Sequence, residues 1–418
     1  MTDAPPTLAQ TPNFLAYLLA RFAFGVISRM LVVVVGWQIY DLTNNPLHLG
    51  YVGLVMFTPV LFLGLIAGDL ADRFDRALLV AAGSLMACAA LIGLAVTALL
   101  PETSLAAIYI CTAFAGVGIA LSKPALWALL PQIVHSSQLP AAISSATIAT
   151  QTSVIMGPAL AGVLLMAGIA TGYGAAAFFA CLTAVLVLRL TSVKPRSALV
   201  VNGEPTLSRM MGGIRYIRRT PVILGVVVLD LFAVLLGSVI VLLPVFARDI
   251  LEVGPAGLGA LRAAPAVGAL GAAAILTRYT PRRHAGNVML CFTALFGVAI
   301  VVFAVSKNIM LSLAALGVAG AADMISVVIR QSVLQLGTPD EIRGRVVAVS
   351  QMFVSGSNEL GDFRAGIVAA MIGAVPAAIV GGLSTLVVVA IATCVFPAIR
   401  QLTDPRMVEP KPHDLSSK

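Results

Sequence analysis

Long apolar runs alternate with short polar segments along almost the whole chain. A helix needs about 20 apolar residues to cross the hydrocarbon core of a bilayer. The pattern predicts twelve such helices, at 14–40, 47–70, 77–99, 105–130, 140–167, 173–190, 221–247, 257–277, 286–305, 309–331, 345–372 and 376–399. One long polar stretch, 191–220, divides them into six and six. We therefore expect an all-α membrane protein with two six-helix halves.

Composition agrees with this interpretation. Of the 418 residues, 59% are hydrophobic and 11% are charged, whereas soluble domains have about 45–50% apolar and about 25% charged residues. This excludes a secreted enzyme and a disordered regulator. The net charge of +8 does not indicate nucleic-acid binding, because the basic residues lie in short loops and form no basic domain.

The distribution of Lys and Arg predicts the orientation of the helices, because cytoplasmic loops are enriched in these residues. With the N-terminus inside, inner segments hold eighteen basic residues, while outer loops hold only Arg248 and Lys307. Both termini are therefore expected in the cytoplasm. The expected organisation is a tail (1–13), a six-helix bundle (14–190), a linker (191–220), a second six-helix bundle (221–399) and a tail (400–418).

The linker contains an amphipathic segment. Apolar residues recur there at helical spacing, and four arginines fill the other side: Leu207, Met210, Met211, Ile214 and Ile217 against Arg209, Arg215, Arg218 and Arg219. This arrangement is typical of a helix that lies on a membrane surface with its basic residues near anionic lipid. The alternative is a plain linker whose arginines only follow the orientation rule.

The two halves also repeat each other. With a shift of 204 residues, Ser153, Gly157, Ala161 and Gly162 fall on Ser357, Gly361, Ala365 and Gly366. Small residues at four-residue spacing allow helix backbones to approach closely in a bilayer. The fifth and eleventh spans are thus expected to be equivalent, tightly packed helices. Parallel repeats of this kind occur in secondary transporters, whose substrate site lies at the repeat interface.

No motif predicts an enzyme. No Lys follows a Gly, so a phosphate-binding loop is absent, as are HExxH and GxSxG. The five cysteines lie in apolar runs without a CxxC pair, and the four histidines are scattered. We expect neither a metal site nor a cofactor. An ion gradient is the expected energy source.

The loop from Gly68 to Arg76 (Gly-Asp-Leu-Ala-Asp-Arg-Phe-Asp-Arg) resembles the signature between helices 2 and 3 of the major facilitator superfamily. It departs from that signature at Asp75, where Gly is usual, and at Ala77, where a second basic residue is usual. The resemblance implies two parallel six-helix bundles around a central cavity. It also implies a gating role for Gly68, Asp72, Arg73 and Arg76, because in the family this loop packs across the inner end of helix 11 in the outward-open state.

Other motifs favour a particular branch. The segments 36–43, 213–218, 334–346 and 357–363 are similar to those of twelve-helix drug and siderophore exporters related to the enterobactin exporter. Gly157, Pro158 and Gly162 resemble the end of the helix 5 motif of antiporters, which implies a gating role. Thr112 stands where many antiporters carry an Arg on helix 4, which puts the Arg-based proton relay of the family in doubt.

Charges within the spans are the candidate substrate and proton-coupling residues, because a charge at mid-bilayer is costly and usually faces a cavity or a partner. Four such residues lie near the centres of their spans: Arg29, Asp230, Asp323 and Glu359. A fifth candidate, Asp362, lies one turn beyond Glu359 and shares its helix face. Two desolvated carboxylates within one turn repel each other, so at least one is expected to exchange protons near neutrality. The open alternatives are structural pairing of Arg29 or Asp230 and cation coordination by the two acids. Lys123 and Arg330 are expected to extend to the inner interface.

These features together predict a proton-coupled exporter of a small apolar or amphiphilic molecule, such as a siderophore, antibiotic or metabolite. Its expected partners are this substrate, protons and membrane lipid, not nucleic acid, and it is expected to be a monomer in the bacterial inner membrane. The alternatives are a facilitator-type nutrient importer on the same fold and a non-transporting membrane sensor.

Overall fold

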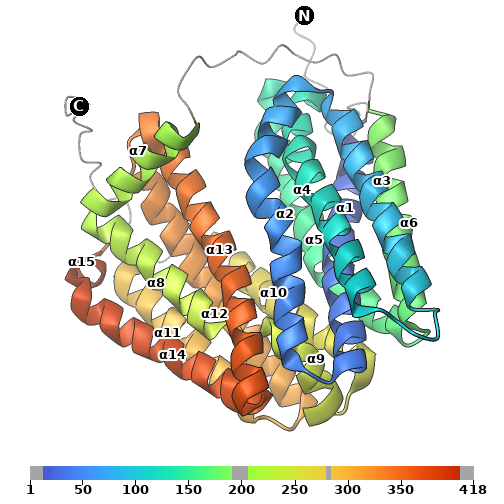
Figure 1. The fold of residues 1–418 in the computed structure, drawn as a ribbon. Helices are drawn as coiled ribbons and strands as arrows, with labels where there is room; N and C mark the ends of the chain where they lie inside the picture. The colour runs from blue at the N-terminus through green and yellow to red at the C-terminus, as the bar shows by residue number, and fades with distance from the viewer. Residues whose placement is uncertain (1–12, 191–205, 279–283, 405–418) are drawn as a thin grey trace, which may run out of the picture. The chain divides into compact units, whose positions relative to one another are not determined.

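The computed structural model describes residues 13–190, 206–278 and 284–404, and all regular elements in these ranges are helical. The first half of the chain forms six long helices that run alongside one another (Figure 1). They are α1 (Phe14–Thr43), α2 (Pro46–Arg73), α3 (Arg76–Thr97), α4 (Leu105–Ile133), α5 (Leu139–Leu165) and α6 (Ile169–Leu188). These six coincide with the first six predicted spans, which confirms the apolar runs as helices.

Polar residues define the ends of these helices. The side-chain oxygen of Asn45 accepts a hydrogen bond from the Leu47 N–H at 3.0 Å, and Pro46 follows at the first helical position of α2. The Asp75 carboxylate accepts bonds from the N–H groups of Ala77 (2.8 Å) and Leu78 (3.1 Å) at the start of α3. A carboxylate satisfies the unpaired N–H groups there. Asp75, which departs from the signature of the superfamily, is thus a helix cap.

The second half contains α8 (Pro221–Gly237), α10 (Gly254–Arg278), α11 (Ala285–Val305), α12 (Ile309–Leu336), α13 (Asp340–Ile372), α14 (Ala374–Val395) and the short α15 (Pro397–Arg400). The predicted span 221–247 lies within Pro221–Ile250, a stretch long and apolar enough to cross a membrane, but its helix is interrupted. After α8 the chain forms a 3-10 turn, η3 (Ile240–Leu242), then α9 (Leu243–Val245) and a π-helical turn, η4 (Phe246–Ile250). Pro244 contributes to the break, because proline has no N–H and its ring clashes with the carbonyl four residues earlier.

Eleven helical segments among the described residues are long and apolar enough to cross a membrane. The other predicted span, 345–372, lies within α13, which is 33 residues long but more polar than the eleven. This helix begins at Asp340, five residues before the predicted start, and Asp340 and Glu341 occupy its first turn. Acidic residues there interact favourably with the helix dipole.

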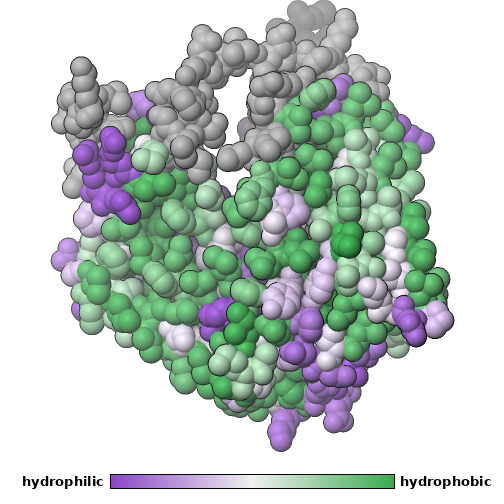
Figure 2. All heavy atoms as spheres, in the orientation of Figure 1, coloured by the Kyte–Doolittle hydropathy of each residue, from purple (hydrophilic) through white to green (hydrophobic). Residues whose placement is uncertain are grey.

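Hydrophobic side chains cover most of the face seen in Figure 2.

Contacts divide the chain into two compact units. The first unit comprises Met1–Val200 and Ala247–Ala263, and the second comprises Val201–Phe246 and Ala264–Lys418. The segment from Ala247 to Ala263 therefore packs with the helices of the first half, although the repeat assigns it to the second half. Each unit is described separately below.

Equivalent glycines of the repeat make equivalent contacts within their own units. A Cβ atom at Gly157 of α5 would lie 2.6 Å from the Cβ of Arg29 on α1. A Cβ atom at Gly361 of α13 would lie 3.0 Å from the Val234 carbonyl oxygen on α8. The fifth span thus packs on the first span of its half, and the eleventh packs on the seventh in the same manner. This geometry is what close backbone approach at small residues requires.

Within the linker, the amphipathic segment forms the helix α7 (Thr206–Arg219), and its contact with the membrane surface stays a prediction. Tyr216 and Ile217 are buried, and the Tyr216 hydroxyl donates to the Gly337 carbonyl oxygen at 2.7 Å. Gly213 lies directly against the backbone of Arg345 on α13. Arg215, Arg218 and Arg219 are exposed. The side chains of 206–210, which include Leu207, Arg209 and Met210, lie outside the described residues. One face of α7 therefore packs on the second unit, and the arginines lie on the other.

A candidate transport site in the second unit

Asp230 and Arg330 form an ion pair between α8 and α12. Their side chains are only 11% and 4% exposed. The prediction that Arg330 extends to the membrane interface is therefore wrong, because its guanidinium lies inside the helix bundle beside a carboxylate. A buried pair of this kind satisfies both charges, and loss of either partner would leave the other uncompensated. This geometry matches the structural alternative for Asp230.

Two charged residues of α13 meet the end of α8, where its last carbonyl groups lack partners within the helix. Arg364 donates from Nε to the Leu235 carbonyl oxygen at 3.0 Å and from a terminal nitrogen to that of Leu236. The hydroxyl of Ser238, the first residue after α8, donates to the Asp362 carboxylate. Although helical spacing places them far apart around α13, Asp362 and Arg364 both reach this end. Because α8 ends at Gly237, its last carbonyl groups and the Ser238 hydroxyl form hydrogen bonds with side chains of α13.

Asp323 differs from Asp230 and Asp362, whose carboxylates are bonded to side chains of other segments. It lies on α12 and lines a cavity of about 150 Å³ within the second unit. The other lining residues include Ser238, Pro265, Phe296 and Asn358, from both sides of the α8 break and from α10, α11 and α13. Asp323 and Asn358 are both exposed. In the described part of the chain, the Asp323 carboxylate has no hydrogen-bond or ion-pair partner. We call this the Asp323 cavity.

The remaining two predicted residues are engaged elsewhere. Glu359 is half-buried on α13, next to Asn358, and Arg29 is exposed on α1, where its stem contacts Gly157 of α5. Each takes part in a polar or electrostatic interaction. The structure therefore gathers Asp323, Asp362 and the residue before Glu359 around the break in α8, whereas Asp230 is paired separately. Arg29 belongs to the first unit.

Of the predicted gating residues, Arg76 donates from a terminal nitrogen to the Ala128 carbonyl oxygen on α4 at 2.9 Å. Only Phe74 and Asp75 separate α2 from α3, so the predicted loop is mostly the last turn of α2. The side chains of Gly68, Asp72 and Arg73 lie outside the described residues.

The helix 5 motif makes a second close approach within the first unit. A Cβ atom at Gly162 would lie 2.8 Å from the Cα of Gly259 and 2.7 Å from the Pro255 carbonyl oxygen, both on α10. The Pro158 carbonyl oxygen would lie 2.7 Å from a Cβ at Gly259. The motif thus provides the smooth surface on which the first part of α10 packs.

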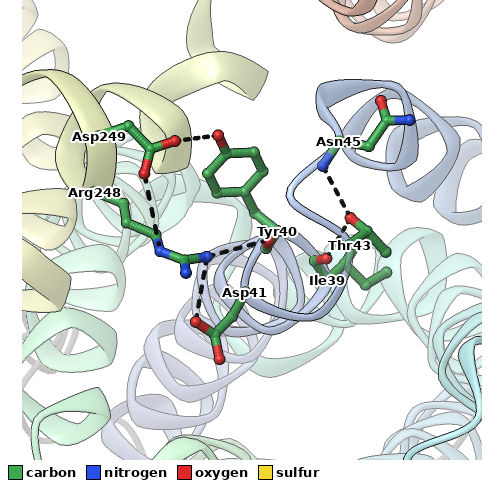
Figure 3. A network of polar contacts seen from close by, with 7 residues as sticks. All are labelled: Ile39, Tyr40, Asp41, Thr43, Asn45, Arg248 and Asp249. Carbon is green, nitrogen blue, oxygen red and sulfur yellow. Dashed lines mark hydrogen bonds and ion pairs between the residues drawn. The ribbon is translucent and has the colours of Figure 1, made fainter.

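A polar cluster that the sequence did not predict joins α1 to η4 (Figure 3). The Tyr40 hydroxyl donates to Asp249, and Arg248 forms an ion pair with Asp41 at 3.3 Å. Arg248 also donates to the Tyr40 carbonyl oxygen at 3.3 Å. We call these four residues the α1–η4 cluster. One feature of the sequence points to this cluster. Arg248 is one of only two basic residues in the predicted outer loops.

The helical architecture and the internal repeat are those expected of a multi-pass membrane transporter of the major facilitator fold. Solved structures of that fold agree over nearly the whole chain. A bacterial homologue of the human lysosomal transporter Spinster, in an inward-facing conformation, superimposes with a TM-score of 0.73 at 15% identity, covering 94% of this chain and 99% of the other. The nucleoside transporter NupG gives 0.73 at 14% identity, covering 92% and 100%.

Sequence comparison identifies the family. The family described as "Transmembrane secretion effector" (MFS_3) matches residues 14–413. The enterobactin exporter EntS of Escherichia coli, and that of Shigella boydii, are 30% identical to this chain over 340 residues, which is 80% of each protein. The chain therefore belongs to the transmembrane secretion effector family of the major facilitator superfamily. It is a transporter and not an enzyme, as its sequence predicted.

Proposed function

We propose that this protein is a proton-coupled exporter that moves a small amphiphilic molecule out of the bacterial cytoplasm by alternating access. The similarity to enterobactin exporters supports export. The concentration of Lys and Arg in alternate loops supports an inner-membrane protein with both termini in the cytoplasm. We further propose that it works as a monomer.

The observation that carries proton coupling is the Asp323 cavity. A mid-span carboxylate that faces a cavity without a partner is costly when charged. Binding a proton removes that charge, and alternating access would expose the group to each side of the membrane in turn. We assign Asp323 as the principal coupling residue, with Glu359 and Asp362 as the second candidates on the neighbouring helix. Asp230 is assigned a structural role because Arg330 holds it.

Two sets of residues are proposed as gates. Gly68, Asp72, Arg73 and Arg76 act at the inner end of the helices, as the resemblance implies. Gly157 and Gly162 let helices slide, because glycines have no side chains that interlock, and Pro158 belongs to the same motif. By the predicted orientation, the α1–η4 cluster lies at the outer end of the first unit. Arg29, next to Gly157, is proposed to contact substrate.

The test is transport in proteoliposomes that contain a pH-sensitive dye and carry an imposed pH gradient. A catecholate siderophore, a hydroxamate siderophore, a macrolide and a cationic dye serve as the first panel. For any compound that the native protein concentrates, Asp323→Asn should abolish uphill transport but retain exchange between equal concentrations. Exchange needs only substrate binding and the change between inward-facing and outward-facing states, whereas uphill transport also needs proton coupling.

The matched control is Glu102→Gln, which removes a carboxylate from the loop between α3 and α4 and should leave transport unchanged. Glu359→Gln and Asp362→Asn are measured separately in the same assay. If Asp323→Asn concentrates substrate at the native rate while one of these two does not, the coupling residue lies on α13. If all three variants do so, none of these three acids is the coupling residue. If the pH gradient drives no uphill transport by the native protein, the proposed proton coupling is wrong.

A further inference from the structure

Arg21 of α1 is held in place by three side chains of the first unit. Its Nε donates to the Thr150 hydroxyl on α5 at 3.0 Å, and a terminal nitrogen donates to the Tyr17 hydroxyl at 3.1 Å. Its guanidinium carbon lies 4.4 Å from the centre of the Trp127 ring on α4. A cation over an indole face is attracted by the electrons of the ring. The plane and position of the guanidinium are thus defined by neutral groups from three helices.

This buried cation has no counter-charge among the side chains that the structure describes. Arg21 is only 9% exposed, and among the described residues its printed partners include no carboxylate. It lies seven residues into α1, about 10 Å along the helix at 1.5 Å per residue. Between residues 14 and 190, acidic residues occur only near helix ends or in loops: Asp41, Asp69, Asp72, Asp75 and Glu102.

The contrast with Arg330 distinguishes a binding site from a structural contact. Both arginines are buried within spans, at 9% and 3% exposed. Arg330 is neutralised by Asp230 of the same unit, whereas the described partners of Arg21 are hydroxyl groups and an aromatic ring. Hydroxyl groups and an indole orient a guanidinium but do not neutralise it, so the charge of Arg21 is available to a ligand.

Arg21 also has free hydrogen-bonding capacity. A guanidinium carries five N–H donors, and only two of these donate to described residues. The remaining terminal nitrogen atom is not among the buried polar atoms that lack partners, so it reaches an accessible surface. Trp127, beside it, is 56% exposed. The accessible edge of a guanidinium therefore lies next to an exposed aromatic surface.

We propose that Arg21, Trp127, Tyr17 and Thr150 form a recognition site for the carboxylate or similar oxyanion of an amphiphile, so that the transported molecule is anionic. The guanidinium edge binds the oxyanion, because its parallel N–H groups match that geometry. Trp127 receives the adjoining apolar or aromatic part. This inference rests on the proposed function in one respect, which is that the chain transports an amphiphile. Proton coupling is not needed for it.

Binding is tested by the fluorescence of Trp127 in the purified full-length protein. Trp37→Phe leaves Trp127 as the single tryptophan, because the chain has two. The protein is placed in nanodiscs of neutral phosphatidylcholine and titrated with three matched probes: phenylbutyrate, phenylbutanol and phenylbutylammonium. Phenylbutyrate should bind about tenfold more tightly than phenylbutanol, a difference of about 1.4 kcal/mol. Phenylbutylammonium should bind most weakly. Equal affinity for phenylbutyrate and phenylbutanol overturns the proposal.

Variants identify the residue responsible. Arg21→Gln should remove the preference for phenylbutyrate and leave the affinity for phenylbutanol unchanged. The control, Arg189→Gln, removes an exposed charge at the end of α6 of the same unit and should keep the preference. If Arg21→Gln does not fold, Thr150→Val retains the charge and loses one anchor, and the preference should fall about threefold. If the folded Arg21→Gln variant keeps the preference for phenylbutyrate, another residue binds the oxyanion and the proposal is overturned. An unchanged preference in Thr150→Val has the same meaning where Arg21→Gln does not fold.

A lipid phosphate is the other source of this chemistry, and a second arm distinguishes it. The titration is repeated in nanodiscs that contain phosphatidylglycerol. Unchanged phenylbutyrate binding supports a soluble substrate, whereas its loss means that the lipid headgroup occupies Arg21, which overturns the substrate assignment. No proton gradient is present in any arm, so failure of this inference and failure of proton coupling are separate results.

Discussion

The hydroxyl of Tyr40, in the last turn of α1, donates a hydrogen bond to the carboxylate of Asp249, 209 positions further along the chain. This contact ties the turn after the seventh predicted span to the first helix, and Arg248 reinforces it through Asp41. Both segments belong to the first unit, so the contact holds Ala247–Ala263 to the helices of the first half.

We expect Tyr40→Phe to loosen this connection. A hydrogen bond to a charged group contributes about 2 kcal/mol, so amide hydrogen exchange in residues 247–253 should accelerate about tenfold or more. Peptides of α3 should be unaffected. Tyr109→Phe is the control, because it removes a hydroxyl that lies 2.8 Å from the His48 ring nitrogen in the same unit. Equal acceleration in both variants would show that the α1–η4 cluster does not hold this segment.

Breaking the buried ion pair should be far more harmful than removing it entirely. Arg330→Met leaves the Asp230 carboxylate uncompensated, and the free energy of unfolding should fall by about 3–5 kcal/mol. Thermal unfolding in detergent measures this change. The double variant Asp230→Leu with Arg330→Met should regain most of the loss. Arg343→Met, at the exposed pair with Asp340, should have almost no effect. A double variant no better than the single one would mean that the charges do not act as a pair.

Gly157→Leu should prevent correct packing of α5 on α1. The added side chain would meet the stem of Arg29, because even a Cβ atom comes within 2.6 Å of it. Gly174→Leu on α6 is the matched control, since nothing lies within 4 Å of a Cβ there. Gly168 is unsuitable, because its φ of +127° strains any other residue. Yield of monodisperse protein on size-exclusion chromatography measures the difference. Equal yields would contradict the packing role of Gly157.

Asp75→Ala should destabilise the start of α3 by about 1 kcal/mol, the usual contribution of a capping side chain. The carboxylate accepts hydrogen bonds from two backbone N–H groups, and Asp75→Asn should retain most of this stability. Ser104→Ala is the control, because Ser104 occupies the same position before α4 without a side-chain hydrogen bond. Thermal unfolding of the three variants gives the comparison. An alanine effect at Asp75 no larger than at Ser104 would exclude capping as its role.

Several functional contacts join residues that local pattern cannot relate. From the sequence, Asp230 and Asp323 were equivalent, because both lie near the middle of a predicted span. The structure separates them, because α12 brings Arg330 to Asp230 and leaves Asp323 facing a cavity. Helical spacing likewise placed Asp362 and Arg364 far apart around α13, yet the broken end of α8 offers a hydroxyl to one and carbonyl oxygens to the other. Partners supplied by other helices decide the role of each charge.

The positions of the spans, the repeat and the family follow from the sequence by itself. A bilayer requires continuous apolar length and satisfied backbone groups, and both leave a direct signal in the order of residues. The break in α8, the pairing of Asp230 and the neutral surroundings of Arg21 were decided only by the tertiary structure. These depend on which faces of separate helices meet, and a charge becomes a counter-ion, a proton site or a ligand site according to the groups that surround it in space.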